Sequence, residues 1–208
     1  MTDTIVFIHG LWMNGMEMSL LQHRFRQSGY QTSRFQYKTV RQSPTENASR
    51  LAEHINRLSA DRLHFICHSL GGLVLRHYLF NHQPGVRGRT VMLGTPNQSS
   101  KAAHQLSRFR LTAALLGKST DQGLLGAVPD WDATHELGII AGDLRLGMGM
   151  IIPGIPKPND GTVTIEETKL EGMQDHITLP VSHFGMLFAE SVFRQSKHFI
   201  EHGCFERR

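Results

Sequence analysis

The stretch Leu63-His64-Phe65-Ile66-Cys67-His68-Ser69-Leu70-Gly71-Gly72 decides the fold of this chain. Its first five residues are mostly apolar and suit a buried strand, and a helical pattern begins directly after the turn. A serine between a strand end and a helix start is held on a sharp turn with its hydroxyl exposed. The first N–H groups of such a helix lack intrahelical partners, so they can bind an oxyanion beside the serine. The pattern Cys67-x-Ser69-x-Gly71 therefore predicts a nucleophile elbow, with Cys67 where glycine is usual.

An ordinary strand-to-helix turn that contains a serine would give the same pattern, so the flanking sequence has to decide. Strands and helices alternate on both sides of the elbow. Apolar or alternating runs predict further strands at residues 4–8, 31–37, 89–93, 137–141 and 176–181. Helical spacing predicts helices from about residue 18 to 25, from a capping box at Ser43-Pro44-Thr45-Glu46, and from about 184 to 201. This alternation predicts an α/β fold with a mostly parallel, doubly wound sheet and helices on both faces.

Two segments depart from the simple alternation. From residue 98 to about 134 the strands stop, although Leu106, Phe109, Ala113 and Leu116 fall on one helical face. Residues 163–167 fit either a short helix or an extended turn. Because we find no repeats and no linker composition, we expect residues 1–208 to form a single domain.

The composition excludes several classes of protein. The 208 residues carry a formal charge of +4, and the basic residues are scattered rather than gathered in a stripe, so we expect no nucleic-acid partner. The net positive charge is compatible with weak contact to an anionic lipid surface. The two cysteines form no disulfide framework, and no signal peptide or membrane-spanning run is evident, so we expect a cytoplasmic protein without integral membrane association. His198 and His202 lack a third ligand nearby in sequence, and we expect neither a metal site nor a cofactor.

A serine hydroxyl needs a base to take its proton, and that base needs a carboxylate to fix its tautomer. Asp160, in the turn Asn159-Asp160-Gly161, and His183, after the last strand, follow Ser69 in the order Ser, Asp, His. Asp143, which ends a strand, is the alternative acid. His176 is the alternative base, but it begins a strand, at the wrong edge of the sheet. In a parallel sheet, catalytic side chains gather beyond the carboxyl ends of the strands, which is where we expect Ser69, Asp160 and His183 to lie.

An oxyanion hole needs two backbone N–H donors. We expect one from Leu70, directly after the nucleophile, and one from Leu11, in the loop His9-Gly10-Leu11-Trp12 after the first strand. Glycine in that loop lets the backbone approach a substrate closely. Trp12 and His68, next to these groups in sequence, are expected to contact the substrate.

Five motifs together resemble the α/β-hydrolase superfamily, and more narrowly its small bacterial lipase/esterase-like proteins. They are His9-Gly10-Leu11-Trp12, His68-Ser69-Leu70-Gly71-Gly72, Gly94-Thr95-Pro96, Asn159-Asp160-Gly161-Thr162-Val163 and Ser182-His183-Phe184-Gly185-Met186-Leu187. The resemblance covers nearly the whole chain. It implies a minimal α/β-hydrolase fold of about six strands that lacks the first two of larger members. It also implies that residues 98–134 occupy the place of a lid or cap, where they shape the acyl pocket; a helix packed on the sheet is the alternative.

The resemblance implies a carboxylic-ester hydrolase with Ser69 as nucleophile, His183 as base and Asp160 as orienting acid, acting on a small-molecule ester or lipid. Acyltransferase and thioesterase activities use the same groups, and a non-catalytic protein of the same fold that binds a lipid or a partner is a further alternative. The sequence does not give the substrate's chain length or head group, the oligomeric state, or whether residues 98–134 move.

Overall fold

The computed structural model describes residues 3–82, 88–108, 110–131, 135–146 and 155–207. Within these residues six strands form one sheet in the order β2-β1-β3-β4-β5-β6, and all of their pairings are parallel. The strands are β1 (Asp3–Ile8), β2 (Gln31–Phe35), β3 (Arg62–His68), β4 (Arg89–Leu93), β5 (Glu136–Gly142) and β6 (Asp175–Leu179). The chain leaves β1 toward one edge and returns through β3 toward the other, which confirms the predicted doubly wound sheet.

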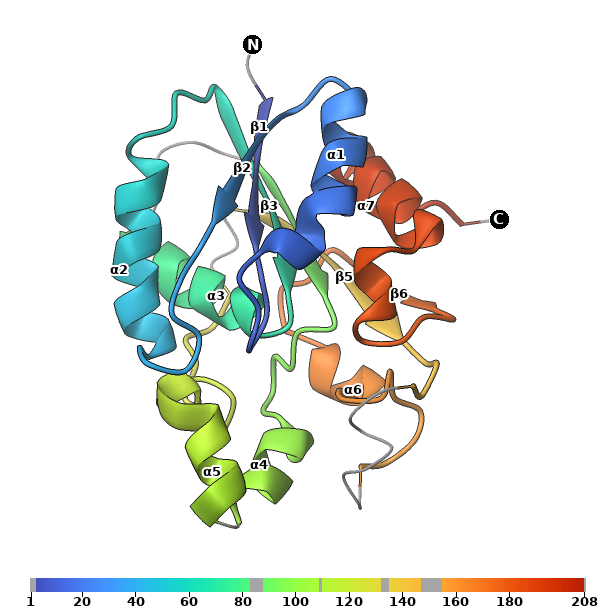
Figure 1. The fold of residues 1–208 in the computed structure, drawn as a ribbon. Helices are drawn as coiled ribbons and strands as arrows, with labels where there is room; N and C mark the ends of the chain where they lie inside the picture. The colour runs from blue at the N-terminus through green and yellow to red at the C-terminus, as the bar shows by residue number, and fades with distance from the viewer. Residues whose placement is uncertain (1–2, 83–87, 109, 132–134, 147–154, 208) are drawn as a thin grey trace.

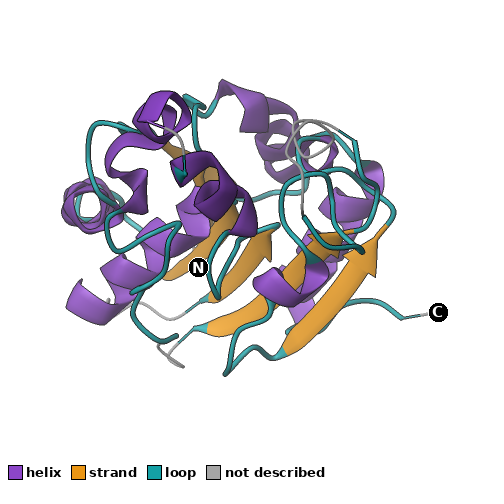
Figure 2. Ribbon diagram, turned by 90° about the horizontal axis from the view of Figure 1, so that it is seen from below, coloured by secondary structure: helices purple, strands orange, loops and turns teal. Residues whose placement is uncertain are grey.

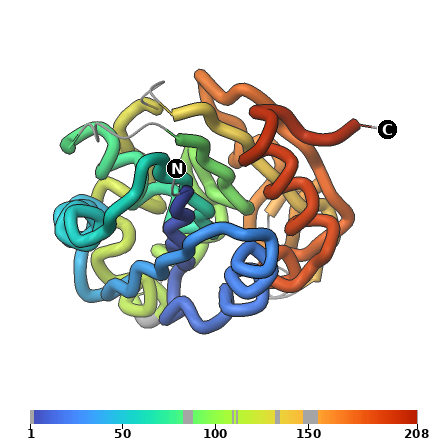
Figure 3. The backbone as a smooth tube through the Cα atoms, turned by 90° about the horizontal axis from the view of Figure 1, so that it is seen from above, coloured from blue at the N-terminus to red at the C-terminus, as the bar shows by residue number. Residues whose placement is uncertain are grey.

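Helices cover both faces of the sheet (Figures 1 and 2). Helices α2 (Pro44–Ile55) and α3 (Leu70–His82) pack together on one face, and α1 (Ser19–Gln27) and α7 (Glu190–His202) lie on the other. Seen from above, α2 in cyan and α7 in red lie on opposite sides of β1 in dark blue (Figure 3). Within the described residues the remaining α-helices are α4 (Lys101–Ser107), α5 (Arg110–Leu116) and α6 (Ile165–Thr168), and short 3-10 helices span Met16–Met18, Gly117–Thr120 and Gly185–Leu187.

The strand residues supply a separate apolar core to each face. Along β1, Val6 and Ile8 join the core under α2 and α3, while Ile5 and Phe7 join the core under α1 and α7. This alternation follows from the two-residue period of a strand. All four side chains are completely buried, as expected for a strand in the interior of a parallel sheet.

Local signals predicted most element boundaries, with differences at the ends of β2 and β6 and at the start of the last helix. The capping box at the start of α2 forms as predicted, with Ser43 and Glu46 each accepting the other's backbone N–H. For residues 163–167, where the sequence left a short helix or an extended turn open, the structure has the short helix α6 from Ile165 to Thr168, directly after the N-cap Thr164. Strand β2 ends two residues before the predicted 37, and strand β6 ends two residues before the predicted 181. The predicted start of the last helix at 184 is wrong, because a 3-10 turn at Gly185–Leu187 and an extended Ala189 precede α7.

Helices α4 and α5 lie beyond the carboxyl ends of the strands (Figure 1). The single helical face predicted for 106–116 is divided between these two short helices. Phe109, expected on that face, lies outside the described residues. In the part of the chain that the structure describes, no helix has the length and apolarity needed to cross a membrane.

Candidate active site

Ser69 occupies the single turn between β3 and α3, as the elbow pattern predicts. Its φ of 52° lies in the left-handed region, which is unfavourable for a residue with a side chain. Three hydrogen bonds hold this conformation: Ser69 N–H donates to Leu93 O at 2.9 Å, and Ser69 O accepts from Thr95 Oγ1 at 3.0 Å and from Gly72 N–H at 3.1 Å. Backbone strain of this kind persists only where the surroundings determine it, and it gathers at functional sites.

Small residues on both sides of Ser69 allow the elbow to form. A Cβ on Gly71 would lie 2.4 Å from Ile8 O and 2.7 Å from His9 O, so α3 meets the end of β1 at a distance that only glycine permits. Cys67 is completely buried in the core, and this burial raises the pKa of its thiol well above the ordinary value. The thiol therefore behaves as a small buried hydrophobe, as predicted.

Asp160 and His183, far apart from Ser69 in sequence, are brought together beside it. His183 Nδ1 lies 2.7 Å from Asp160 Oδ2, and His183 N–H donates to Asp160 O at 2.8 Å. The other carboxylate oxygen of Asp160 accepts the N–H groups of Thr162 at 2.9 Å and Val163 at 2.7 Å. The Asp160 side chain is fully buried, and three of these contacts fix the position of its carboxylate, while the fourth holds its backbone oxygen.

The structure does not bring the two alternative residues into this arrangement. Asp143 follows β5 with an exposed side chain. His176 lies within β6, where its Nε2 is 2.9 Å from Thr168 Oγ1. Asp160 and His183 are therefore the acid and the histidine that the fold places next to Ser69.

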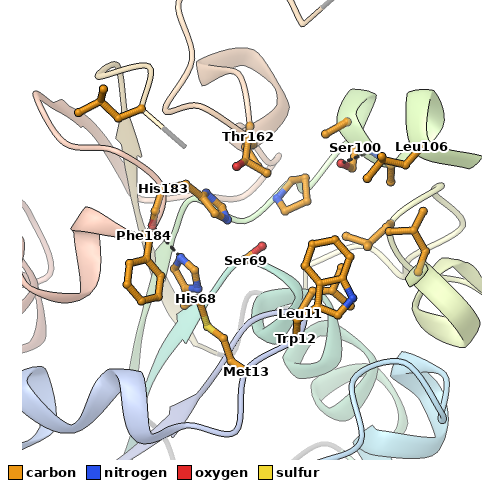
Figure 4. Close-up of a pocket in the computed structure, with 17 residues that line it drawn as sticks. Leu11, Trp12, Met13, His68, Ser69, Ser100, Leu106, Thr162, His183 and Phe184 are labelled. Atoms are coloured by element: carbon orange, nitrogen blue, oxygen red, sulfur yellow. Dashed lines mark hydrogen bonds between the residues drawn. The ribbon is translucent and has the colours of Figure 1, made fainter. Parts of the chain in front are cut away.

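Ser69 and His183 open onto one cavity of about 300 Å³ (Figure 4). Most of its wall is apolar, and six of the lining residues come from the 98–134 segment: Ser100, Ala102, Ala103, Leu106, Leu116 and Leu124. Among the described residues, no hydrogen bond joins Ser69 Oγ to the His183 ring. Such a bond is often long before substrate binds, so the role of Ser69 as nucleophile stays a prediction.

The loop after β1 approaches the elbow closely. A Cβ on Gly10 would lie 2.8 Å from His68 Nδ1 and 3.2 Å from Ser69 Cβ. The buried Tyr37 fixes this loop: its hydroxyl donates to His9 O at 2.6 Å, and its ring stacks on His9 at 4.4 Å. Burial lowers the pKa of His9 and raises that of Tyr37, so both remain neutral.

The two predicted oxyanion donors come from the two segments that meet here, with Leu11 in the loop after β1 and Leu70 at the start of α3. Leu70 is the first residue of α3, where the N–H groups have no intrahelical acceptor. Leu11 follows Gly10 and lines the cavity, and within the described residues its N–H donates no hydrogen bond. Their use as an oxyanion hole stays a prediction.

Trp12 and His68, the predicted substrate contacts, both line the cavity but differ in exposure. Trp12 is 45% exposed at the cavity's edge, and its Nε1–H donates to Leu115 O of α5 at 2.8 Å. His68 is only 1% exposed, and its Nε2 lies 2.9 Å from His183 O. Burial, followed by the nearby His183, lowers the pKa of His68 to about 3. Substrate contact by either residue stays a prediction.

The contacts of Tyr37, His68 and Gly94 have no signal in the sequence. A Cβ on Gly94, which has a φ of 56°, would lie 3.0 Å from both Asp160 Oδ2 and His183 Nδ1. The Gly94-Thr95-Pro96 motif is visible in the sequence, but its closeness to the acid and the histidine depends on the folded sheet. In the part of the chain that the structure describes, no three His, Cys, Asp or Glu side chains group closely enough to hold a metal ion.

The sequence pattern of the family described as "Domain of unknown function (DUF7379)" matches residues 4–146, more than half of the chain. The chain belongs to the DUF7379 family. No curated protein matches its sequence.

Solved structures with the same architecture share little sequence with this DUF7379 member. The mature lipase BlEst2 of Bacillus licheniformis is 18% identical with a TM-score of 0.70, over 96% of this chain and 91% of the lipase. The metagenomic carboxyl esterase MGS0156 is 16% identical with a TM-score of 0.65, over 87% and 64% of the two chains. The carboxylesterase CesB of Bacillus subtilis is 12% identical with a TM-score of 0.60, over 97% and 84%. At these identities the likeness establishes the fold, a minimal α/β-hydrolase fold.

Proposed function

We propose that this chain is a serine hydrolase that cleaves carboxylic esters through an acyl-enzyme on Ser69. One observation carries the proposal: the hydrogen-bonded pair of Asp160 and His183 lies beside a serine held at a φ of 52°, and Ser69 and His183 open onto one apolar cavity. A strained serine, a histidine and a buried carboxylate are the groups that acyl transfer needs. The likeness to structures described as lipases and carboxylesterases supports the same reaction class.

The reaction begins with the proton of Ser69 Oγ. Because Asp160 Oδ2 accepts the Nδ1–H of His183, the Nε2 of His183 carries the lone pair that takes this proton. Ser69 Oγ then bonds to the ester carbonyl carbon, and the negative oxygen is stabilised by the N–H groups of Leu11 and Leu70. Each such donor contributes about 2.7–4 kcal/mol of transition-state stabilisation.

The C–O bond of the alcohol breaks next, and His183 gives its proton to the leaving alcohol. Water then attacks the acyl-enzyme while His183 takes one of its protons. The carboxylic acid leaves, and the proton returns to Ser69 Oγ. Each of these steps uses only side chains and backbone groups of the chain together with water.

The cavity favours an ester with an apolar acyl group. Its volume of about 300 Å³ is at the small end of the usual range for small-molecule sites. Leu106, Leu116 and Leu124 would line the acyl chain, and Trp12 at the edge would contact the substrate as it enters. This assigns residues 98–134 to the wall of the acyl pocket. Because Cys67 and Cys204 are both free thiols, we also propose a cytoplasmic location.

Hydrolysis of p-nitrophenyl esters of increasing chain length tests the proposal. We expect measurable kcat/KM for the wild type and a loss of at least about 10⁴-fold for Ser69→Ala and for His183→Ala. Ser196→Ala is the matched control, because this buried hydroxyl in α7 has no partner among the described residues and lies outside the cavity. Hydrolysis that survives both active-site substitutions would contradict the proposal, and a folded wild type without hydrolysis would favour a non-catalytic binder.

A further inference from the structure

His68 connects three loops of the candidate site, although it is not one of the three groups assigned to catalysis. It directly precedes Ser69 in the chain, its Nδ1 faces Gly10, and its Nε2 lies 2.9 Å from the backbone oxygen of His183. Its ring also contacts the His183 ring, with centroids 4.7 Å apart. In Figure 4 the His68 and His183 rings lie on the same side of Ser69.

The hydrogen bond defines the proton position on His68. A carbonyl oxygen can only accept, so Nε2 must carry the proton and donate to His183 O. Nδ1 then carries a lone pair, and within the described residues this atom has no hydrogen-bond partner. Of the two ring nitrogens, Nε2 is thus the one that joins His68 to the main chain of His183.

The hydrogen bond from His68 supports His183 from a direction that Asp160 does not cover. Asp160 contacts His183 through the side chain at Nδ1 and through the backbone N–H, and both contacts come from the 159–163 turn. The contact with His68 holds the backbone oxygen of His183 from the elbow itself. This hydrogen bond therefore links the main chain of the base, His183, to the residue that directly precedes the nucleophile Ser69.

We propose that His68 is a positioning residue, whose Nε2–H holds the main chain of His183 so that the imidazole stays in register with Ser69. The inference rests on the proposed ester hydrolysis and adds a role to a residue that sequence reasoning assigned to substrate contact. His68 acts through the main chain of His183. It stays neutral, because burial keeps its pKa far below neutral pH. A base displaced by about 1 Å costs on the order of 10² in rate.

The chain offers a matched control in His77. This residue of α3 is 4% exposed, and its Nε2 lies 2.7 Å from the backbone oxygen of Gln122. It thus makes the same kind of buried bond to a loop carbonyl, but it does not line the cavity. A substitution at His77 removes an equivalent bond, together with the contact of its Nδ1 with Thr45 Oγ1 at 3.2 Å, without touching His183.

Four variants separate positioning from general stabilisation: His68→Leu, His68→Gln, His77→Leu and His77→Gln. We expect His68→Leu to lower kcat about 10- to 100-fold with KM changed less than about threefold, because the acylation geometry is lost and the pocket is kept. The amide of His68→Gln can still donate to His183 O, so it should recover most of the loss. Both His77 variants should keep the wild-type kcat. An unchanged kcat in His68→Leu, or an equal loss in His77→Leu, would overturn the inference.

Imidazole NMR of the folded proteins decides the same question without activity. In the wild type, His68 should be protonated at Nε2, and His183 should show a slowly exchanging Nδ1–H bonded to Asp160. We expect the latter proton to exchange faster in His68→Leu and to be unchanged in His77→Leu. Wild-type His68 protonated at Nδ1 would overturn the inference even if His68→Leu does not fold. If the wild type cleaves no ester, the proposed function fails, while these spectra still decide the position of His68.

Discussion

Substitution of Gly71 by alanine separates the geometry of the elbow from the stability of the fold. The added Cβ would lie 2.4 Å from Ile8 O, whereas an ordinary contact needs at least 3.4 Å. Because the obstructing atom is backbone, the start of α3 has to move away from β1 by about 1 Å, and Ser69 moves with it. Overpacking of this kind costs about 1–3 kcal/mol, and alanine recovers about 1 kcal/mol through its higher helix propensity.

We therefore expect Gly71→Ala to lower the free energy of unfolding by no more than about 2 kcal/mol, measured by urea denaturation. Its reaction with a fluorophosphonate should slow far more, by about 10²-fold, because a displacement of about 1 Å removes the attack geometry. Gly29→Ala is the control. Gly29 has a φ of 93°, a Cβ added there would meet no atom within 4 Å, and the residue precedes β2 at the end of the sheet away from Ser69.

Gly29→Ala should cost about 1 kcal/mol of stability because alanine disfavours this φ, and it should react with the probe at the wild-type rate. A Gly71→Ala protein that is labelled as fast as the wild type would refute the reasoning. It would mean that the contact between α3 and β1 does not position the serine.

Other parts of the structure give further predictions. Asp160→Asn should lower kcat by about 10⁴-fold with little change in KM, because the amide no longer fixes the tautomer of the base. Leu106→Trp should lower kcat/KM for long-chain esters at least about tenfold relative to the acetate, because Leu106 lines the apolar cavity. A thiol reagent should modify one cysteine of the native protein and two after denaturation, because Cys204 is exposed and Cys67 is buried. Burial lowers the pKa of His64 to about 4. In the unfolded chain the pKa of this residue is near 6.5, so the unfolded chain binds the proton more readily. The free energy of unfolding should therefore fall as the pH falls from about 6.5 to 4, by up to about 1.4 kcal/mol per pH unit from this residue.

Each of these predictions has a result that would contradict it. An Asp160→Asn enzyme within tenfold of the wild-type kcat would remove the carboxylate from the mechanism. A chain-length profile that Leu106→Trp leaves unchanged would place the acyl chain elsewhere. Two modified thiols in the native protein would contradict the burial of Cys67. For the acid effect, His64→Asn keeps an acceptor for the bound N–H and removes the titrating ring, so a pH dependence equal to that of the wild type would exclude His64 as its source.

Signals that act within a few residues were predictable from the sequence. The capping box of Ser43 and Glu46 joins residues three apart, and the apolar runs of the strands depend only on their own composition. The turn at Asp160 is visible in Asn159-Asp160-Gly161, and the chain order predicts the role of the acid for this residue. The structure adds the hydrogen bond between Asp160 and His183, and the acid role stays a prediction.

Contacts between distant residues were not predictable in the same way. Tyr37 donates to the carbonyl of His9 across 28 residues, and His68 bonds to His183 across 115. Neither pair has a characteristic spacing, because the register of the sheet decides which loops meet. The burial of His68 likewise comes from the packing of three loops around its ring, so sequence reasoning treated it as a substrate contact.

Covalent labelling of Ser69 tests the proposed chemistry most directly. Folded wild-type protein treated with a fluorophosphonate should gain one equivalent of probe, measured by intact mass, with the modified peptide containing Ser69. Ser69→Ala should gain none, and His183→Ala should react at least about 10³-fold more slowly, because the hydroxyl then has no base. No labelling of the folded wild type, or a probe attached to another residue, would contradict the assignment of Ser69 as an activated nucleophile.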